Sequence, residues 1–400
     1  MPHETAARLR GFGTTIFAEM TALATEAGAI NLGQGFPDED GPREILEAAS
    51  EALLAGPNQY TPGRGTPELR AAVVAHAARW YGRELDPDTQ VQVTVGATEG
   101  IAAALLGVCE PGDAVVTFEP YYDSYAAGIA MSGGVRRTVA LRPPSFGLDV
   151  EALRAAVRGD AVGGRSARRG DGAGPARVLV LNSPHNPTGK VFTRAELEAI
   201  AEVCREHDLV AICDEVYEHL AFDGEHVPLA TLPGMAERTL TVSSAGKTFA
   251  LTGWKVGWVT GPPALVTAVA TAKQFLTFSG HGPLQHAVAR ALALDDAYFS
   301  VARDRLRTRR DRLCDGLEAA GLTTLRPEGG YFAIGDVASI GEDDGAAFCR
   351  ALPARCGVVG VPVSVFCDDP DLGRTLVRFA YCKREDVIDE AASRLAGLRG

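Results

Sequence analysis

The chain has 400 residues and a formal net charge of -12, from 51 acidic and 39 basic residues. Hydrophobic residues make up 46% and charged residues 22%, so the chain can bury a sizeable core and is not a disordered polymer. Its length suits one large domain with a second, smaller unit. The negative charge argues against nucleic acids and anionic membranes as partners, because both repel an acidic surface.

The first residues, MPHETAARLRGF, contain no apolar run typical of a signal peptide, and no stretch approaches the ~18 consecutive apolar residues of a membrane span. We therefore expect a soluble, cytoplasmic protein. Eight cysteines are scattered along the chain without a C-x-x-C pair. We expect them to be reduced and buried, and we expect no metal site.

Short apolar runs alternate with amphipathic stretches through the middle of the chain, which predicts a parallel sheet covered by helices, an α/β fold. After Leu284 the pattern changes to long helices and then to short strands such as GGYFAIGD and TLVRFAYC. We therefore predict a large domain over residues 46–284 and a smaller α+β domain over 285–400, joined by an N-terminal segment over 1–45. The apolar runs are VQVTV at Val91, AVVTF at Ala114, RVLVLN at Arg177, LVAICD at Leu209 and TLTVSS at Thr239.

One segment interrupts this alternation, from Val157 to Arg177. It is rich in glycine, alanine and arginine and has no hydrophobic period. We interpret it as a mobile insertion at the surface.

Lys247 follows the predicted strand TLTVSS and lies in the run SSAGKTFALTGWKVGW. The letters G-K-T resemble the end of a P-loop, but Thr241 stands where that motif requires its first glycine. The letters S-A-G-K fit the S-x-x-K motif of serine acyl-enzymes, yet neither S-D-N nor K-T-G occurs in the chain. Both interpretations therefore lack their second motif.

The same region suits an aldehyde cofactor with a pyridine ring and a phosphate. Such a cofactor needs a lysine whose amine can be neutral, which burial and a cationic neighbour such as Lys255 favour. Asp214, at the end of LVAICD, could keep a pyridine nitrogen protonated. The run VTVGATEG predicts a strand, a glycine turn and a helix start, where Ala97 and Thr98 could bind phosphate together with Ser244 and Lys255.

With these motifs the chain resembles the class I aminotransferases of pyridoxal phosphate (PLP) fold type I. It is most similar to the branch that holds kynurenine transaminases, methionine aminotransferases and actinobacterial N-succinyldiaminopimelate aminotransferases. The resemblance implies a large domain with a mostly parallel seven-stranded sheet and a smaller α+β domain. It also implies transfer of an amino group from an L-amino acid to a 2-oxo acid such as 2-oxoglutarate. The motifs run from NLGQGFPDEDGP at Asn31 to VRFAYCKRED at Val377 and include NQYTPGRGTPELR, FEPYYDSY, LNSPHNPTGKVF and CDEVYEHL.

The resemblance assigns a role to each matching residue. Lys247 holds the cofactor as a Schiff base and moves the proton, and Asp214 binds the pyridine nitrogen. Tyr60 reaches the phosphate of the neighbouring subunit, which implies a homodimer. Around the ring, Tyr122 and Val216 cover the two faces, Asn186 and Tyr217 bind the phenolic oxygen, and Ala97, Thr98, Ser244 and Lys255 bind the phosphate.

The substrate end of the site is also assigned by resemblance. Arg378 grips the α-carboxylate with help from Gly35 and Asn186, and Phe17 lines the side-chain pocket. Relatives that favour aromatic substrates often carry an aromatic residue where this chain has Gly280, just before His281. We therefore expect donors with medium or large neutral side chains, or donors like N-succinyldiaminopimelate.

Three other functions compete with this one. A PLP-dependent carbon-sulfur β-lyase acting on cysteine conjugates would use the same groups, and the sequence does not separate it from an aminotransferase. A PLP-binding regulator needs a DNA-binding unit, for which this acidic chain has no spare segment. An ATPase is disfavoured by Thr241.

Overall fold

The computed structural model describes residues 5–13, 15–160 and 174–399, and its centre is a seven-stranded sheet. The strand order is β2-β8-β7-β6-β5-β3-β4, in which β8 runs antiparallel to both neighbours and all other neighbours are parallel. The predicted α/β fold with a mostly parallel sheet is therefore confirmed. The strands are β2 (Val91–Val95), β3 (Ala114–Glu119), β4 (Val135–Ala140), β5 (Ala176–Asn182), β6 (Val210–Asp214), β7 (Thr239–Ser244) and β8 (Val256–Thr260).

The predicted apolar runs form β2, β3, β5, β6 and β7, and their continuous hydrophobicity reflects burial on both faces. In β5, Val178 and Val180 face one side of the sheet while Leu179 and Leu181 face the other, as the two-residue period of a strand requires. The apolar runs identified in the sequence do not include β4 or β8. Strand β4 is a half-buried edge strand with two arginines, and β8 lies inside a motif rich in glycine and tryptophan.

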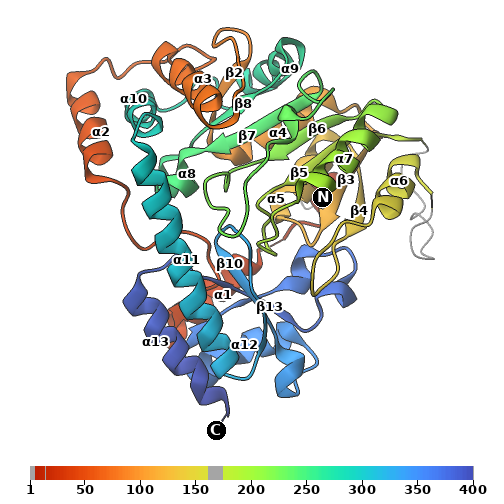
Figure 1. Ribbon diagram of the computed structural model, residues 1–400, viewed down its shortest axis with the longest axis vertical. Coiled ribbons are helices and arrows are strands. Elements are labelled where there is room, and N and C mark those ends of the chain that lie inside the picture. The colour runs from red at the N-terminus through yellow and green to blue at the C-terminus, as the bar shows by residue number, and fades with distance from the viewer. Residues whose placement is uncertain (1–4, 14, 161–173, 400) are drawn as a thin grey trace.

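Helices cover both faces of this sheet (Figure 1). Helices α4, α5 and α9 pack on the Val178 side, and α6 and α7 pack on the Leu179 side. Helix α10 packs against α2 and α3 beside β2 and β8. The bounds are α2 (Arg43–Ala55), α3 (Pro67–Tyr81), α4 (Gly96–Val108), α5 (Asp123–Ser132), α6 (Val150–Arg158), α7 (Arg194–Glu206), α8 (Ala245–Thr248), α9 (Pro263–Gln274) and α10 (Gly282–Leu292).

A smaller α+β unit lies below this layer in Figure 1, and the long helix α11 (Asp296–Ala319) leads into it. Its antiparallel sheet has the order β12-β13-β10-β9. The N-terminal segment joins the same core, since α1 packs there and β1 pairs in parallel with β11. The elements are α1 (Ile16–Ala27), β1 (Ile30–Asn31), β9 (Thr323–Leu325), β10 (Phe332–Asp336), α12 (Gly345–Cys356), β11 (Val358–Val359), β12 (Val361–Pro362), β13 (Leu376–Ala380) and α13 (Glu385–Ala396).

The expected division at residues 284 and 285 stays a prediction. Helix α10, whose residues lie on both sides of that point, packs in one hydrophobic cluster with β2 and β8 of the large sheet.

Regular secondary structure extends further into the segment from Val157 to Arg177 than predicted. Val157 is a buried residue of α6, and Arg177 already belongs to β5, because apolar neighbours draw both ends of the segment into regular structure. The middle of the predicted insertion, 161–173, lies outside the described residues. None of the described helices has the length and apolar character needed to cross a membrane.

Candidate active site

The topology brings the predicted site residues to one edge of the large sheet. Strands β2, β3, β5, β6 and β7 all end at this edge because they run in the same direction, and ligands of α/β proteins bind at such edges. Strand β8 is antiparallel and therefore begins there, which brings in Lys255 just before it.

A cavity of about 310 Å³ opens at this edge. It lies within the size range of small-molecule sites. Every predicted site residue except Tyr60 lines it. The predicted residues in its wall are Phe17, Gly35, Ala97, Thr98, Tyr122, Asn186, Asp214, Val216, Tyr217, Ser244, Lys247, Lys255 and Arg378.

Lys247 lies in the short helix α8, directly after β7. Its Nζ donates a hydrogen bond to the carbonyl of Gly35 at 2.8 Å and lies 5.1 Å from the centre of the Tyr331 ring. Burial lowers the pKa of Lys247 to about 8, and the nearby cations Arg378 and Lys255 act in the same direction. The amine is therefore partly neutral near physiological pH, as a nucleophilic lysine requires.

Asp214 is the last residue of β6 and is buried. Tyr125 donates a hydrogen bond from its hydroxyl to Asp214 Oδ2 at 2.6 Å. Burial raises the pKa of Asp214 to about 6, while the bonds from Tyr125 and from the backbone of Val216 oppose that rise. The carboxyl group is thus held in one orientation and can bind a protonated ring nitrogen.

The N-terminus of α4 also lines the cavity, and the first backbone N–H groups of a helix have no partner within the helix. Gly96 has a φ of +73°, and a Cβ at this position would lie 3.1 Å from the Nζ of Lys255. Only glycine lets the ammonium group approach the helix start so closely. Ser244 and Thr252 line the same cavity. Free N–H groups, a hydroxyl and an ammonium group together suit a phosphate.

Tyr122, Val216 and Tyr217 also lie in the cavity wall. The rings of Tyr122 and Tyr125 meet edge to face at 5.7 Å. Asn186 is positioned through its backbone N–H, which donates to Asn182 Oδ1 at 2.7 Å. An aromatic ring and an aliphatic side chain in one cavity wall can hold a flat heterocycle.

Arg378 lies in β13 of the small unit and is 1% exposed. Its Nη1 donates to Asn186 Oδ1 at 3.0 Å and its Nη2 to the Gly33 carbonyl at 2.8 Å. Its Nε has no hydrogen-bond partner in the described part of the chain. Phe332 stacks against the guanidinium group at 3.9 Å, and burial lowers the pKa of Arg378 to about 10. A buried cation bonded only to neutral oxygens is suited to bind a carboxylate.

The residues present therefore fit the chemistry of pyridoxal phosphate. The cavity combines a partly neutral lysine, a buried carboxylate and a helix start with an ammonium group. A Cβ on Gly35 would lie 2.2 Å from Cζ of Phe332, so the tight packing beside Arg378 also depends on glycine.

Sequence reasoning missed several cavity residues, namely Gln34, Phe36, Ile101, Tyr125, Asn182, Thr252 and Phe332. Tyr125 stands three residues after Tyr122 in the motif FEPYYDSY, so its position at the start of α5 was a usable signal. Phe332 had no comparable signal, because only tertiary packing brings β10 to Arg378.

Tyr60, and two residues that were not assigned a role in the site, lie outside the cavity wall. Tyr60 is 84% exposed, and its ring packs edge to face on Phe278 at 5.4 Å. Gly280 and His281 precede α10 and do not line the cavity of the single chain.

The family of the chain follows from comparison with known proteins. The model for the family "Aminotransferase class I and II" matches residues 27–395. The chain belongs to this family and is an enzyme that transfers amino groups between amino acids and 2-oxo acids. The predicted family, enzyme class and fold type I are thereby confirmed.

Individual relatives match along nearly the whole chain. The chain is 50% identical to the probable N-succinyldiaminopimelate aminotransferase of Mycobacterium tuberculosis, over 98% of each chain. It is 38% identical to the methionine aminotransferase of Escherichia coli, over 98% of this chain and 97% of that protein. A solved structure of N-succinyldiaminopimelate aminotransferase from M. tuberculosis superposes with a TM-score of 0.93 at 51% identity, covering 99% of this chain and 100% of the other.

Proposed function

We propose that this aminotransferase uses pyridoxal phosphate, held covalently by Lys247. The observation that supports this best is the cavity in which buried Lys247, Asp214 and Arg378 meet. When bound, the group supplies an aldehyde carbon and an electron-withdrawing ring. Asp214 would hold the ring nitrogen, and the start of α4 with Ser244 and Lys255 would hold the phosphate.

Lys247 would move the proton of the reaction. Its lowered pKa leaves part of the amine neutral, so that Nζ can take a proton from the substrate α-carbon and deliver it elsewhere. Tyr331 donates a hydrogen bond from its hydroxyl to the Lys247 carbonyl at 2.6 Å, which fixes the backbone that carries this amine.

Arg378 would bind the α-carboxylate shared by all amino acid and 2-oxo acid substrates. A planar guanidinium group can make two parallel bonds to a carboxylate. Asn186 and Gly33 already hold the group in place, so substrate binding needs little further ordering.

The side-chain pocket would select medium or large neutral donors. Phe17 and Phe36 offer apolar surface at the cavity. Relatives named for N-succinyldiaminopimelate and for methionine support donors of this size. We propose that an acylated diamino acid or a similarly long donor is used with 2-oxoglutarate.

We further propose a homodimer in which Tyr60 reaches the site of the other subunit. Tyr60 and Phe275 are both more than four-fifths exposed, Phe278 packs on the ring of Tyr60, and Phe278 and Leu276 are also exposed. Large apolar groups of this kind mark protein interfaces.

Steady-state rates with a panel of amino donors and 2-oxoglutarate test the proposed function. Long neutral donors should give the highest kcat/KM. A clear preference for aspartate, which needs a dedicated second cation, would contradict the proposed pocket. Pyruvate and ammonia released from a cysteine conjugate without any 2-oxo acid would instead favour a β-lyase.

A further inference from the structure

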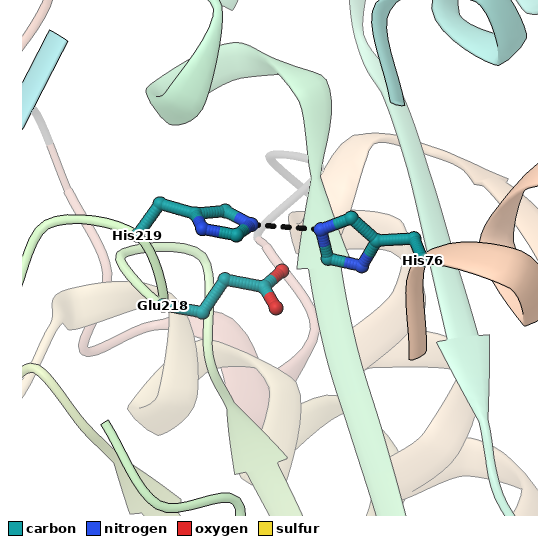
Figure 2. A group of neighbouring side chains, drawn as sticks. All are labelled: His76, Glu218 and His219. Atoms are coloured by element: carbon teal, nitrogen blue, oxygen red, sulfur yellow. Dashed lines mark hydrogen bonds between the residues drawn. The ribbon is translucent and has the colours of Figure 1, made fainter. Parts of the chain in front are cut away.

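Three side chains with metal-ligating atoms lie close together beside the turn that carries Val216 and Tyr217. His76 comes from α3, and Glu218 and His219 come from the turn after β6. Figure 2 shows the two imidazole rings pointing toward each other with the carboxylate of Glu218 beside them. One ligand atom from each residue lies within 4.8 Å of the other two, and His76 and Glu218 are buried.

The two imidazole rings are hydrogen-bonded to each other. His76 Nε2 lies 2.7 Å from His219 Nε2, a distance at which one ring donates its N–H and the other accepts it. Moving the shared proton to the Nδ1 of its own ring would leave both Nε2 atoms ready to bind a cation.

The carboxylate of Glu218 is already oriented by neighbours. Tyr81 donates to Oε2 at 2.7 Å and Ser243 donates to Oε1 at 2.5 Å. Each oxygen keeps a further lone pair. Hydroxyl groups that fix a carboxylate in this way are typical of the surroundings of metal ligands.

A cavity of about 430 Å³ adjoins the cluster, and Glu218 and His219 are in its wall. Asp296 and Ala297, which also line it, are exposed, so water and ions can reach the carboxylate and the ring of His219 from outside.

We propose that His76, Glu218 and His219 bind a divalent cation of the zinc class, with water from the adjoining cavity as a further ligand. Two imidazole nitrogens, one carboxylate oxygen and an open position form a donor set that zinc accepts. Tetrahedral zinc sites place ligand atoms about 3.3 Å apart, so the two rings need to separate by only about 0.6 Å. The ion would tie α3 to the turn that carries two residues of the active site.

The spacing of the ligands explains why the sequence predicted no metal. His76 and His219 are 143 residues apart, and no short motif connects them. The proposal is independent of the enzyme's substrate.

The test uses the full chain loaded with its cofactor, treated with EDTA, desalted and titrated with Co²⁺ or Zn²⁺. Elemental analysis after gel filtration should find one zinc per chain, and Co²⁺ should give the visible absorption bands of tetrahedral coordination. His76→Gln and His219→Ala should lose this metal. His286→Ala, which removes an exposed histidine of α10, is the matched control and should keep it.

Far-UV circular dichroism and the absorption of the bound cofactor verify that each variant is folded. If a variant fails this check, zinc-edge X-ray absorption on the unaltered protein still decides, because it should detect two imidazole ligands. The proposal is overturned if the unaltered protein retains no metal, if folded His76→Gln and His219→Ala chains retain it fully, or if the absorption spectrum contains no imidazole shell. Any of these results would mean that the three residues bind no metal ion and serve only as hydrogen-bonding partners in the fold.

Discussion

Replacing Arg378 by methionine should separate substrate binding from folding. The side chain can make two charge-assisted hydrogen bonds to a substrate carboxylate, each worth about 1.5–3 kcal/mol. Their loss should lower kcat/KM by roughly 10²- to 10⁴-fold. Most of the effect should be an increase in KM for both the amino acid and the 2-oxo acid, because the carboxylate is bound equally throughout the reaction.

The stability of the same variant should change little. Burial lowers the pKa of Arg378 to about 10, well below its value in the unfolded chain. The unfolded chain therefore holds the proton more tightly, and the cation destabilises the native state below pH 10 by about 3 kcal/mol. Removing it relieves that cost but leaves Asn186 Oδ1 and the Gly33 carbonyl without their donor, at about 1–3 kcal/mol each. The free energy of unfolding should therefore change by no more than about 3 kcal/mol.

Initial-rate kinetics with varied amino and oxo acid, together with urea unfolding, measure both quantities. Arg309→Met is the matched control, because Arg309 is equally buried but binds Glu39 at 2.6 Å, away from the cavity. The control should lower stability and leave KM unchanged. An Arg378→Met enzyme with KM within threefold of the unaltered enzyme, or one that is simply unfolded, would refute this reasoning.

Three further outcomes are expected. Asp214→Ala should fold but lose activity by roughly 10²-fold or more, since a preorganised charge is removed, and near-normal turnover would assign its role to another residue. Tyr125→Phe removes a bond that favours the ionised form of Asp214, so the pKa of that carboxyl should rise and the acidic limb of the kcat profile should move about 1–2 pH units upward; an unshifted profile would contradict this. Lys247→Ala and Tyr60→Ala chains, each inactive alone, should regain activity when they are reassembled as mixed dimers, because one of the two sites then holds both intact residues. Verified heterodimers without activity would count against a shared site.

Residues within short motifs were the most predictable part of the site. Asp214 ends an apolar strand, while Lys247, Ala97 and Thr98 follow one within three residues, and parallel strands must end at one edge of the sheet. Local sequence is sufficient in such cases, because the direction of the strand fixes where the next residue lies.

Residues that depend on tertiary packing were less predictable. The position of Lys255 depends on β8 being antiparallel, and the apolar runs did not include that strand. The stacking of Phe332 on Arg378 and the meeting of His76 with His219 join segments that share no local pattern. Nothing in the local sequence around Tyr60 indicates its exposed position.

The most direct test of the central claim is borohydride reduction of the cofactor-loaded enzyme followed by peptide mapping. The buried, partly neutral amine of Lys247 should carry the reduced cofactor, and the purified protein should be yellow before reduction. Label on Lys255, or on no lysine at all, would contradict the assignment of this cavity as the active site of the aminotransferase.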